Sequence, residues 1–208
     1  MAETLPECPR LIERPFPIVI SGASGTGKTS VVNKLLASDG RIVRVLTATT
    51  RPIRRGEVEG QDYEFFSEKE FEKKRKMGYF AESAKVYDNW YGVPKANIAK
   101  GLKNGKWVVV NVDIQGGLTI QKDFPEAILI FVLPPSMEAL TERLMGRGTD
   151  SPEVIKKRLE IAQAEMSIAP KYDYVVVNDE VKDCTKRLLS IILAETSRTN
   201  RGLTMPKG

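Results

Sequence analysis

The chain has 208 residues and a net charge of +5, and its 41% hydrophobic and 28% charged residues are ordinary for a globular protein and exclude wholesale disorder. The positive charge favours negatively charged partners in general, while the absence of histidine excludes the commonest general base and metal ligand. No apolar run is long enough to span a bilayer and residues 1–17 lack a signal-peptide pattern, so we expect a cytoplasmic protein with no membrane partner.

The first elements expected in chain order are a strand and a helix joined by a glycine-rich loop. Residues 1–15 are aperiodic, and we expect them to form an N-terminal extension outside the fold. The apolar, β-branched run 17–21 predicts a buried strand, and residues 29–37 predict a helix. The glycine-rich segment therefore lies where a strand passes into a helix.

That segment has the pattern G-x-x-x-x-G-K-[ST] of a phosphate-binding P-loop. Its glycines permit a tight turn that points backbone N–H groups at phosphate oxygens, and the N-terminus of the following helix adds partial positive charge. Lys28 supplies a mobile charge for the β- and γ-phosphates, and Thr29 a hydroxyl for Mg²⁺. We expect ATP or GTP to bind here, at Gly22, Ala23, Ser24, Gly25, Thr26, Gly27, Lys28, Thr29 and Ser30.

Three further apolar runs, at 107–112, 127–133 and 174–177, predict buried strands. Near-continuous apolar strands that alternate with helical segments indicate a parallel sheet covered by helices on both faces. We therefore expect an α/β fold with a P-loop core at 16–46, 104–135 and 170–200, followed by a C-terminal tail at 201–208.

The polar stretch 47–103 does not fit this rhythm, and it predicts an inserted lobe. Within it, Ser67 and Glu70 form a capping box, which predicts a helix from there to about Gly78. A second helix is expected at 94–103.

Residues 136–169 predict a helical lid. Ser136 is a helix cap, and Ser151 is a second cap followed by Pro152, the residue favoured in the first turn of a helix. The glycine-containing turn 146–150 lies between the two helices. A helix, a flexible basic turn and a helix are suited to closing over a ligand.

Several segments, in order and spacing, resemble guanylate kinase: the P-loop, residues 50–63 (TRPIRRGEVEGQDY), residues 90–92 (WYG), residues 113–116 (DIQG) and residues 146–149 (GRGT). The resemblance runs from about residue 17 to about residue 195. It implies an enzyme of purine nucleotide metabolism that transfers the γ-phosphoryl group of ATP to GMP, and also to dGMP, with Mg²⁺ as cofactor. The lobe at 47–103 would then be the GMP-binding lobe.

The resemblance also implies how the lobe would hold GMP. Arg51 and Arg54 would grip the acceptor phosphate, for which guanidinium forks are suited, and Tyr63 and Tyr91 would donate hydroxyl hydrogen bonds to it. Guanine presents N1–H and an amino group on one edge, and a carboxylate can accept from both. The residues expected near the base are Glu82 and Asp113, together with Thr47 and Val93.

On the donor side, the resemblance implies that lid arginines offset charge on the moving phosphoryl group. These are Arg143, Arg147 and Arg158, which join Lys28 and Arg51 as the expected catalytic residues. Asn178 and Asp179, after the last strand, resemble the family's adenine-side contact.

Four positions depart from the family's usual residues, and one of them, Ala23 in place of the usual loop proline, should affect only the stiffness of the loop. Thr47 stands where serine is expected and keeps the hydroxyl, whereas Val93 stands where serine or threonine meets the guanine and cannot form that hydrogen bond. Asn111 replaces a usual aspartate and lowers the negative charge near Mg²⁺. We expect weaker acceptor binding from Val93, and no change of reaction.

Two alternatives follow from the same residues. Another nucleoside monophosphate kinase would share the donor site and differ in the acceptor base. A guanylate-kinase-like module that only binds phosphorylated peptides would generally lack the P-loop lysine and the lid arginines, both of which are present in this chain. A nucleic-acid partner is not expected, because no base-stacking or groove-reading motif accompanies the positive charge.

Overall fold

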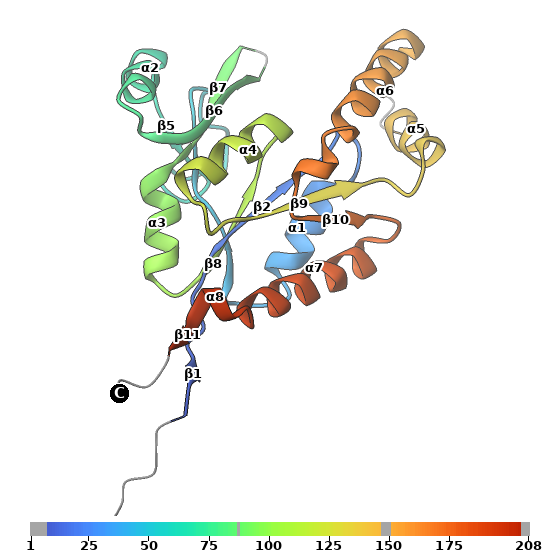
Figure 1. Cartoon of the computed structure of the whole chain (residues 1–208). Coiled ribbons are helices and arrows are strands. Elements are labelled where there is room, and N and C mark those ends of the chain that lie inside the picture. Colours follow the sequence, from blue (N-terminus) through green and yellow to red (C-terminus); the bar gives the residue numbers. More distant parts are fainter. Residues whose placement is uncertain (1–7, 87, 147–150, 205–208) are drawn as a thin grey trace, which may run out of the picture.

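The computed structural model describes residues 8–86, 88–146 and 151–204. Its centre is a five-stranded sheet in the order β10-β9-β2-β8-β3, and every neighbouring pair of strands is parallel (Figure 1). The strands are β2 (Pro17–Ser21), β3 (Ile42–Arg44), β8 (Trp107–Asn111), β9 (Ile128–Leu133) and β10 (Tyr174–Val177). The predicted α/β fold with a parallel core sheet is confirmed.

Side chains that alternate along the strands give this sheet two buried faces. On β2, Ile18 and Ile20 pack with α1 (Lys28–Leu36) and α7 (Val181–Thr196). Val19 points the other way and packs with α3 (Lys95–Lys103) and α4 (Ile114–Asp123). Burial on both faces explains why these strands are almost continuously apolar.

The lobe at 47–103 contains a second sheet that the sequence did not predict. Its order is β5-β4-β7-β6, with β4 (Thr47–Thr49), β5 (Tyr63–Phe65), β6 (Phe80–Val86) and β7 (Asn89–Pro94). The predicted helix is α2 (Glu68–Lys76), and its capping box is formed: the Ser67 side chain accepts from the Glu70 amide while the Glu70 side chain accepts from the Ser67 amide. Phe71 of this helix stacks on Phe80 with ring centroids 4.4 Å apart, so aromatic packing joins helix and sheet.

The two predicted lid helices are α5 (Met137–Met145) and α6 (Pro152–Met166). Ser136 and Ser151 cap them as expected, accepting hydrogen bonds from the amides of Ala139 and Val154. Leu140 and Leu144 of α5 and Ala162 of α6 pack around Ala23 of the P-loop. In Figure 1 these helices rise at one end of the core sheet and the lobe rises at the other.

The ends of the described chain meet beneath the core. β1 (Arg10–Leu11) pairs antiparallel with β11 (Leu203–Thr204), which follows the short helix α8 (Thr199–Gly202); a 3₁₀ turn (Ala169–Lys171) precedes β10. The sequence did not predict this pairing, because each strand has only two residues and its partner lies at the other end of the chain. None of the described helices is long and apolar enough to cross a membrane.

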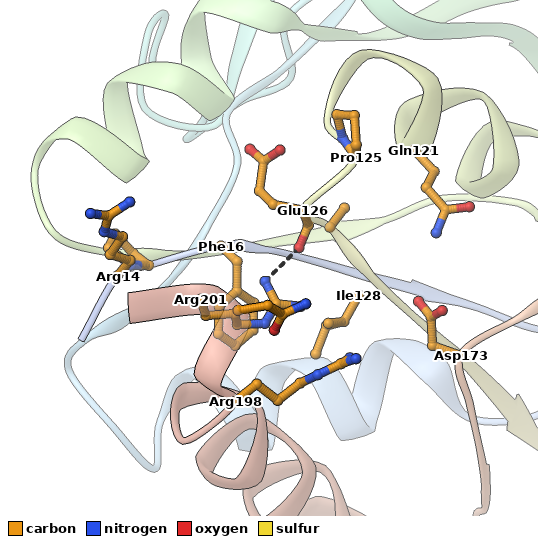
Figure 2. Close-up of a pocket in the computed structure, with 12 residues that line it drawn as sticks. Arg14, Phe16, Gln121, Pro125, Glu126, Ile128, Asp173, Arg198 and Arg201 are labelled. Atoms are coloured by element: carbon orange, nitrogen blue, oxygen red, sulfur yellow. Dashed lines mark hydrogen bonds between the residues drawn. The ribbon is translucent and has the colours of Figure 1, made fainter. Parts of the chain in front are cut away.

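A buried ion pair fastens this end of the molecule to the core. The Glu195 carboxylate is 1% exposed and accepts from Tyr174 Oη and, at 2.7 Å, from Arg201 Nε. Arg201 also donates to the Glu126 carbonyl at 2.8 Å and lies over the Phe16 ring (Figure 2). Burial alone would raise the pKa of Glu195, but the hydrogen bonds from Tyr174 and Arg201 outweigh it, and the pKa is lowered.

We expect Arg201→Ala to lower the free energy of unfolding by about 3–5 kcal/mol, because it leaves the buried Glu195 carboxylate without its best partner. Arg198 also contacts Glu195, at 3.2 Å, but its side chain is 55% exposed. Arg198→Ala is therefore the matched control, with an expected loss below about 1 kcal/mol. Urea denaturation of the two variants measures the difference, and equal losses would contradict the role given to Arg201.

Candidate active site

The P-loop between β2 and α1 has the backbone that its glycines were expected to permit. Gly25 and Gly27 have φ values of 89° and 87°, in the left-handed region. A side chain at Gly27 would also come within 2.4 Å of the Asn178 amide nitrogen. Lys28 turns back over the loop, and its Nζ donates to the carbonyls of Gly22 and, at 2.8 Å, Ala23. The ammonium group is thus held against the carbonyl groups at the start of the loop.

Asn178 and Arg143 form hydrogen bonds to the P-loop and to the loop after β10. The Asn178 side chain is 2% exposed and its Nδ2 donates to the Thr26 carbonyl at 2.7 Å. Its Oδ1 has no hydrogen-bond partner within the described part of the chain. Arg143 donates to the carbonyls of Asn178 at 2.9 Å and Asp179 at 3.2 Å. Both residues were expected to face ATP, and in the structure their polar groups stabilise the loop that ends β10 and the turn of the P-loop.

A cleft of about 590 Å³ joins the P-loop to the lobe. Ser24, Lys28 and Thr29 lie on the P-loop side, and Asn111 and Asp113 lie where β8 ends. The lobe contributes most of the predicted acceptor residues: Thr47, Tyr63, Glu82, Tyr91 and Val93. Residues from separate strands of two sheets are therefore gathered around one cavity.

Glu82 and Asp113 meet in this cleft. Asp113 caps α4, with its Oδ1 accepting from the Gly116 amide at 2.7 Å. A side chain at Gly116 would lie 2.7 Å from Glu82 Cγ and 3.2 Å from Asp113 Oδ1, so glycine is needed for both carboxylates to reach the site. Burial, and secondarily repulsion from Asp113, raises the pKa of Glu82 to about 7. Strong perturbation of a carboxyl group in a cleft is typical of a functional site.

Arg51 is held by a partner that the sequence reasoning missed. Its Nη1 and Nη2 donate to the two oxygens of Glu57 at 2.8 Å and 2.6 Å, and only 8% of the residue is exposed. The guanidinium lies 5.1 Å from the centroid of the Tyr63 ring. The pKa of Glu57 falls to about 2, chiefly because of Arg51 and then because of the Arg54 amide. The predicted phosphate-gripping loop is thus ordered around one ion pair.

The whole chain was compared with known proteins. The family model of guanylate kinase matches residues 14–195. A guanylate kinase from Caldanaerobacter subterraneus is 45% identical over 88% of this chain and 89% of its own length, and one from Clostridium tetani is 45% identical over 91% of each. The crystal structure of guanylate kinase from Anaplasma phagocytophilum is 33% identical, covers 92% of both chains and has a TM-score of 0.71.

The chain belongs to the guanylate kinase family. As a guanylate kinase it is a nucleoside monophosphate kinase, an ATP:GMP phosphotransferase. The cleft between the P-loop and the lobe is the cavity in which the structure gathers the residues that the resemblance singled out. A second cavity, of about 490 Å³, lies where β2 and β9 begin and is lined by Arg14, Phe16 and Asp173 among others (Figure 2). No residue that the resemblance singled out lines this second cavity.

Not every residue expected from the guanylate kinase pattern lines the cleft. Arg51 does not line the cleft, although its guanidinium lies 5.1 Å from the centroid of the Tyr63 ring. Arg54 is exposed, and its amide donates to Glu57 at 2.8 Å. Arg158 is half-buried on α6, and Arg147 lies outside the described residues. Asp179 is exposed and pairs with Arg187 at 3.3 Å. Within the described residues, the charged side chains named in this paragraph are therefore absent from the lining of the cleft.

Two acidic residues of this guanylate kinase were missed by sequence reasoning. Glu57 lies within the segment that carries the resemblance, three residues after Arg54, and that spacing could have indicated a partner for the arginines. Glu165, near the end of α6, lines the cleft beside Ser24 and Lys28. A single glutamate on an amphipathic helix resembles any solvated charge, so no local signal marked it.

Proposed function

We propose that the cleft holds ATP and GMP together and transfers the γ-phosphoryl group directly from one to the other, reversibly, giving ADP and GDP. The observation that carries this proposal is the meeting of Glu82 and Asp113 with Lys28 and Thr29 around one cavity. A P-loop alone fits any nucleoside triphosphatase, whereas a pair of carboxylates opposite it fits the donor edge of guanine.

Glu82 and Asp113 read the acceptor base in this proposal. Guanine N1–H and the exocyclic amino group are two donors on one edge, and an ionised carboxylate accepts from both. Adenine presents an unprotonated N1 in the same place, so a carboxylate would face a lone pair. A site built for hydrogen bonds rejects an analogue that leaves its buried groups unpaired. dGMP presents the same base edge and is expected to be accepted as well.

The acceptor phosphate lies near Tyr63 and Tyr91, whose rings have centroids 6.3 Å apart beside Arg51. Their hydroxyl groups can donate to phosphate oxygens, while Arg51 and Arg54 supply positive charge from the loop that Glu57 orders. Thr47, the first residue of β4, adds a hydroxyl to the lining of the cleft. Val93 is buried and lines the cleft with an apolar surface, so it contributes shape and no hydrogen bond.

The transfer step needs positioning and charge, and no covalent intermediate, because the acceptor phosphate is already an anionic nucleophile at neutral pH. Lys28 and the P-loop amides stabilise the charge on the donor phosphates, and Arg143, Arg147 and Arg158 add positive charge from the lid. Closure of lid and lobe would exclude water, which otherwise competes as an acceptor. A mechanism of this kind suits a protein without histidine.

The cleft also offers oxygen ligands that suit Mg²⁺. Thr29 at the first turn of α1 lines it together with Asn111, and hydroxyl and amide oxygens are hard ligands of the type Mg²⁺ prefers. Bound with ATP, Mg²⁺ would neutralise charge on the β- and γ-phosphates. With Asn111 in place of an aspartate, the protein would contribute one negative charge fewer.

Acceptor-stimulated ATP consumption tests the proposed function. With Mg²⁺ present, GMP and dGMP are expected to be the best acceptors in a panel that also contains AMP, CMP, UMP and dTMP, by at least about 100-fold in kcat/KM, as expected for readout of a hydrogen-bonding edge. Highest activity with a pyrimidine nucleotide would contradict the roles given to Glu82 and Asp113. Absence of turnover with every acceptor would favour a binding module.

A further inference from the structure

Glu165 belongs to none of the groups that the sequence singled out, yet it lies in the donor half of the cleft. It is the penultimate residue of α6 and lines the cavity together with Ser24, Lys28 and Thr29. Its helix is anchored there, because Ala162 packs around Ala23 of the P-loop and Met166 packs against the same cluster. The carboxylate is therefore held near the phosphate-binding loop by buried apolar contacts.

The surroundings of this carboxylate act on its charge in opposite directions. Burial and, less strongly, Asp113 disfavour the charge, whereas the Lys28 ammonium and a hydrogen bond from the Ser24 amide favour it; burial dominates, so the pKa of Glu165 is raised. Lys28 and the P-loop amides are the groups expected to bind donor phosphates. The glutamate and a phosphate group would thus call on the same two donors.

We propose that Glu165 is a further residue of the donor site, whose carboxylate competes with the donor nucleotide's phosphates for the Ser24 amide and the Lys28 ammonium. The proposal rests on the proposed function to the extent that the P-loop binds the donor. It assigns Glu165 an effect on binding opposite in sign to that of the neighbouring Lys28.

The direction of the effect follows from charge. A di- or triphosphate has more charge and more acceptor oxygens than one carboxylate, so it can take over both donors. The α6 backbone that carries Glu165 is fixed near the P-loop, because Ala162 of α6 packs against Ala23. Like charges that share a partly buried site repel each other. The Glu165 carboxylate therefore weakens the binding of the donor phosphates to the P-loop.

Binding of ADP measures this competition without turnover. Isothermal titration in buffer with EDTA, which removes Mg²⁺ as a variable, should show ADP binding about 3–10-fold tighter to Glu165→Gln than to the parent protein. Glu160→Gln is the matched control, because Glu160 is exposed on the same helix and the variant has the same net charge. We expect its Kd for ADP to stay within about two-fold of the parent value.

Equal or weaker ADP binding by Glu165→Gln, relative to Glu160→Gln, would overturn the proposal. GMP binding is measured on the same preparations and should be unchanged, since a general disturbance of the fold would alter both ligands. Failure of the parent protein itself to bind ADP, or undiminished binding in Lys28→Met, would count instead against the proposed donor site. The two failures are therefore distinguishable.

Discussion

Replacing Lys28 with methionine is expected to lower kcat by about 1,000-fold or more, the largest effect that we expect of any single substitution in this chain. Methionine keeps most of the length and the apolar stem of lysine but removes its charge. In the structure the Lys28 ammonium donates to the carbonyls of Gly22 and Ala23 in the P-loop. In the variant, the phosphoryl group being transferred would no longer be stabilised by the positive charge of Lys28.

Lys34→Met is the matched control, because Lys34 is exposed in the last turn of the same helix. Its kcat should stay within about two-fold of the parent value, as expected for a surface charge. Initial rates at saturating ATP and GMP measure both variants, with thermal unfolding to establish that each is folded. Undiminished turnover by folded Lys28→Met would remove the P-loop lysine from the mechanism.

The features predicted correctly from the sequence are those controlled by neighbours in the chain. The central strands of the core are buried on both faces, so a short run such as residues 127–133 was sufficient to locate β9 within a residue or so. The run 174–177 also forms a strand, but at the edge of the sheet, where only Val176 is buried rather than the whole strand as expected. The helix starts at Ser67, Ser136 and Ser151 follow from hydrogen bonds between residues three apart. Local rules of this kind need no knowledge of the rest of the fold.

The small sheet of the lobe could not be predicted in the same way. β4 and β5 have three residues each, and β6 carries polar residues such as Glu82 and Ser83. These strands are stabilised by pairing with distant strands and by aromatic packing on Phe71, neither of which leaves a periodic pattern. β3, also of three residues, was missed in the core sheet for the same reason.

The candidate site shows the same division. The P-loop was predicted from its own residues, but the meeting of Glu82 with Asp113 came only from the family resemblance, because Glu82 lies on β6 of the lobe and Asp113 caps α4 of the core. Asn178 was expected beside adenine, a prediction that the structure leaves untested; its amide nitrogen donates to the Thr26 carbonyl of the P-loop, a contact that the sequence did not predict.

Replacing Glu82 with glutamine is expected to lower kcat/KM for GMP by about 100-fold or more. The amide would present an N–H₂ donor to a base edge that itself offers two donors, so one hydrogen bond is lost and a buried donor is left without a partner, at about 1–3 kcal/mol each. AMP, with an acceptor at N1, should lose far less. The ratio of kcat/KM for GMP and AMP therefore separates a change in base reading from general damage.

The pH dependence of the same variant provides an independent check. The pKa of Glu82 is raised to about 7, so its carboxylate gains a proton as the pH falls through that value, and kcat/KM for GMP should fall with it by about tenfold per unit. The phosphate of GMP also titrates, near pH 6. In Glu82→Gln only the phosphate transition should remain. Glu68→Gln, which changes an exposed glutamate of the same lobe, should keep both transitions.

The raised pKa also requires that Glu82 be unfavourable for stability at alkaline pH. A carboxyl group with a pKa of about 7 in the folded protein and an ordinary pKa of 4.5 binds its proton more tightly in the folded state. Its contribution is therefore most favourable below pH 4.5 and is lost as the pH rises through 7.

Glu82→Gln, which has no charge to bury, should raise the free energy of unfolding by up to about 3 kcal/mol at pH 8 and by less than about 1 kcal/mol at pH 5. Urea denaturation at the two pH values measures this gain. Suppose that the variant loses activity towards GMP but gains no stability at pH 8. Burial would then not destabilise the ionised Glu82 carboxylate, and the steep pH dependence of kcat/KM would have to come from another group.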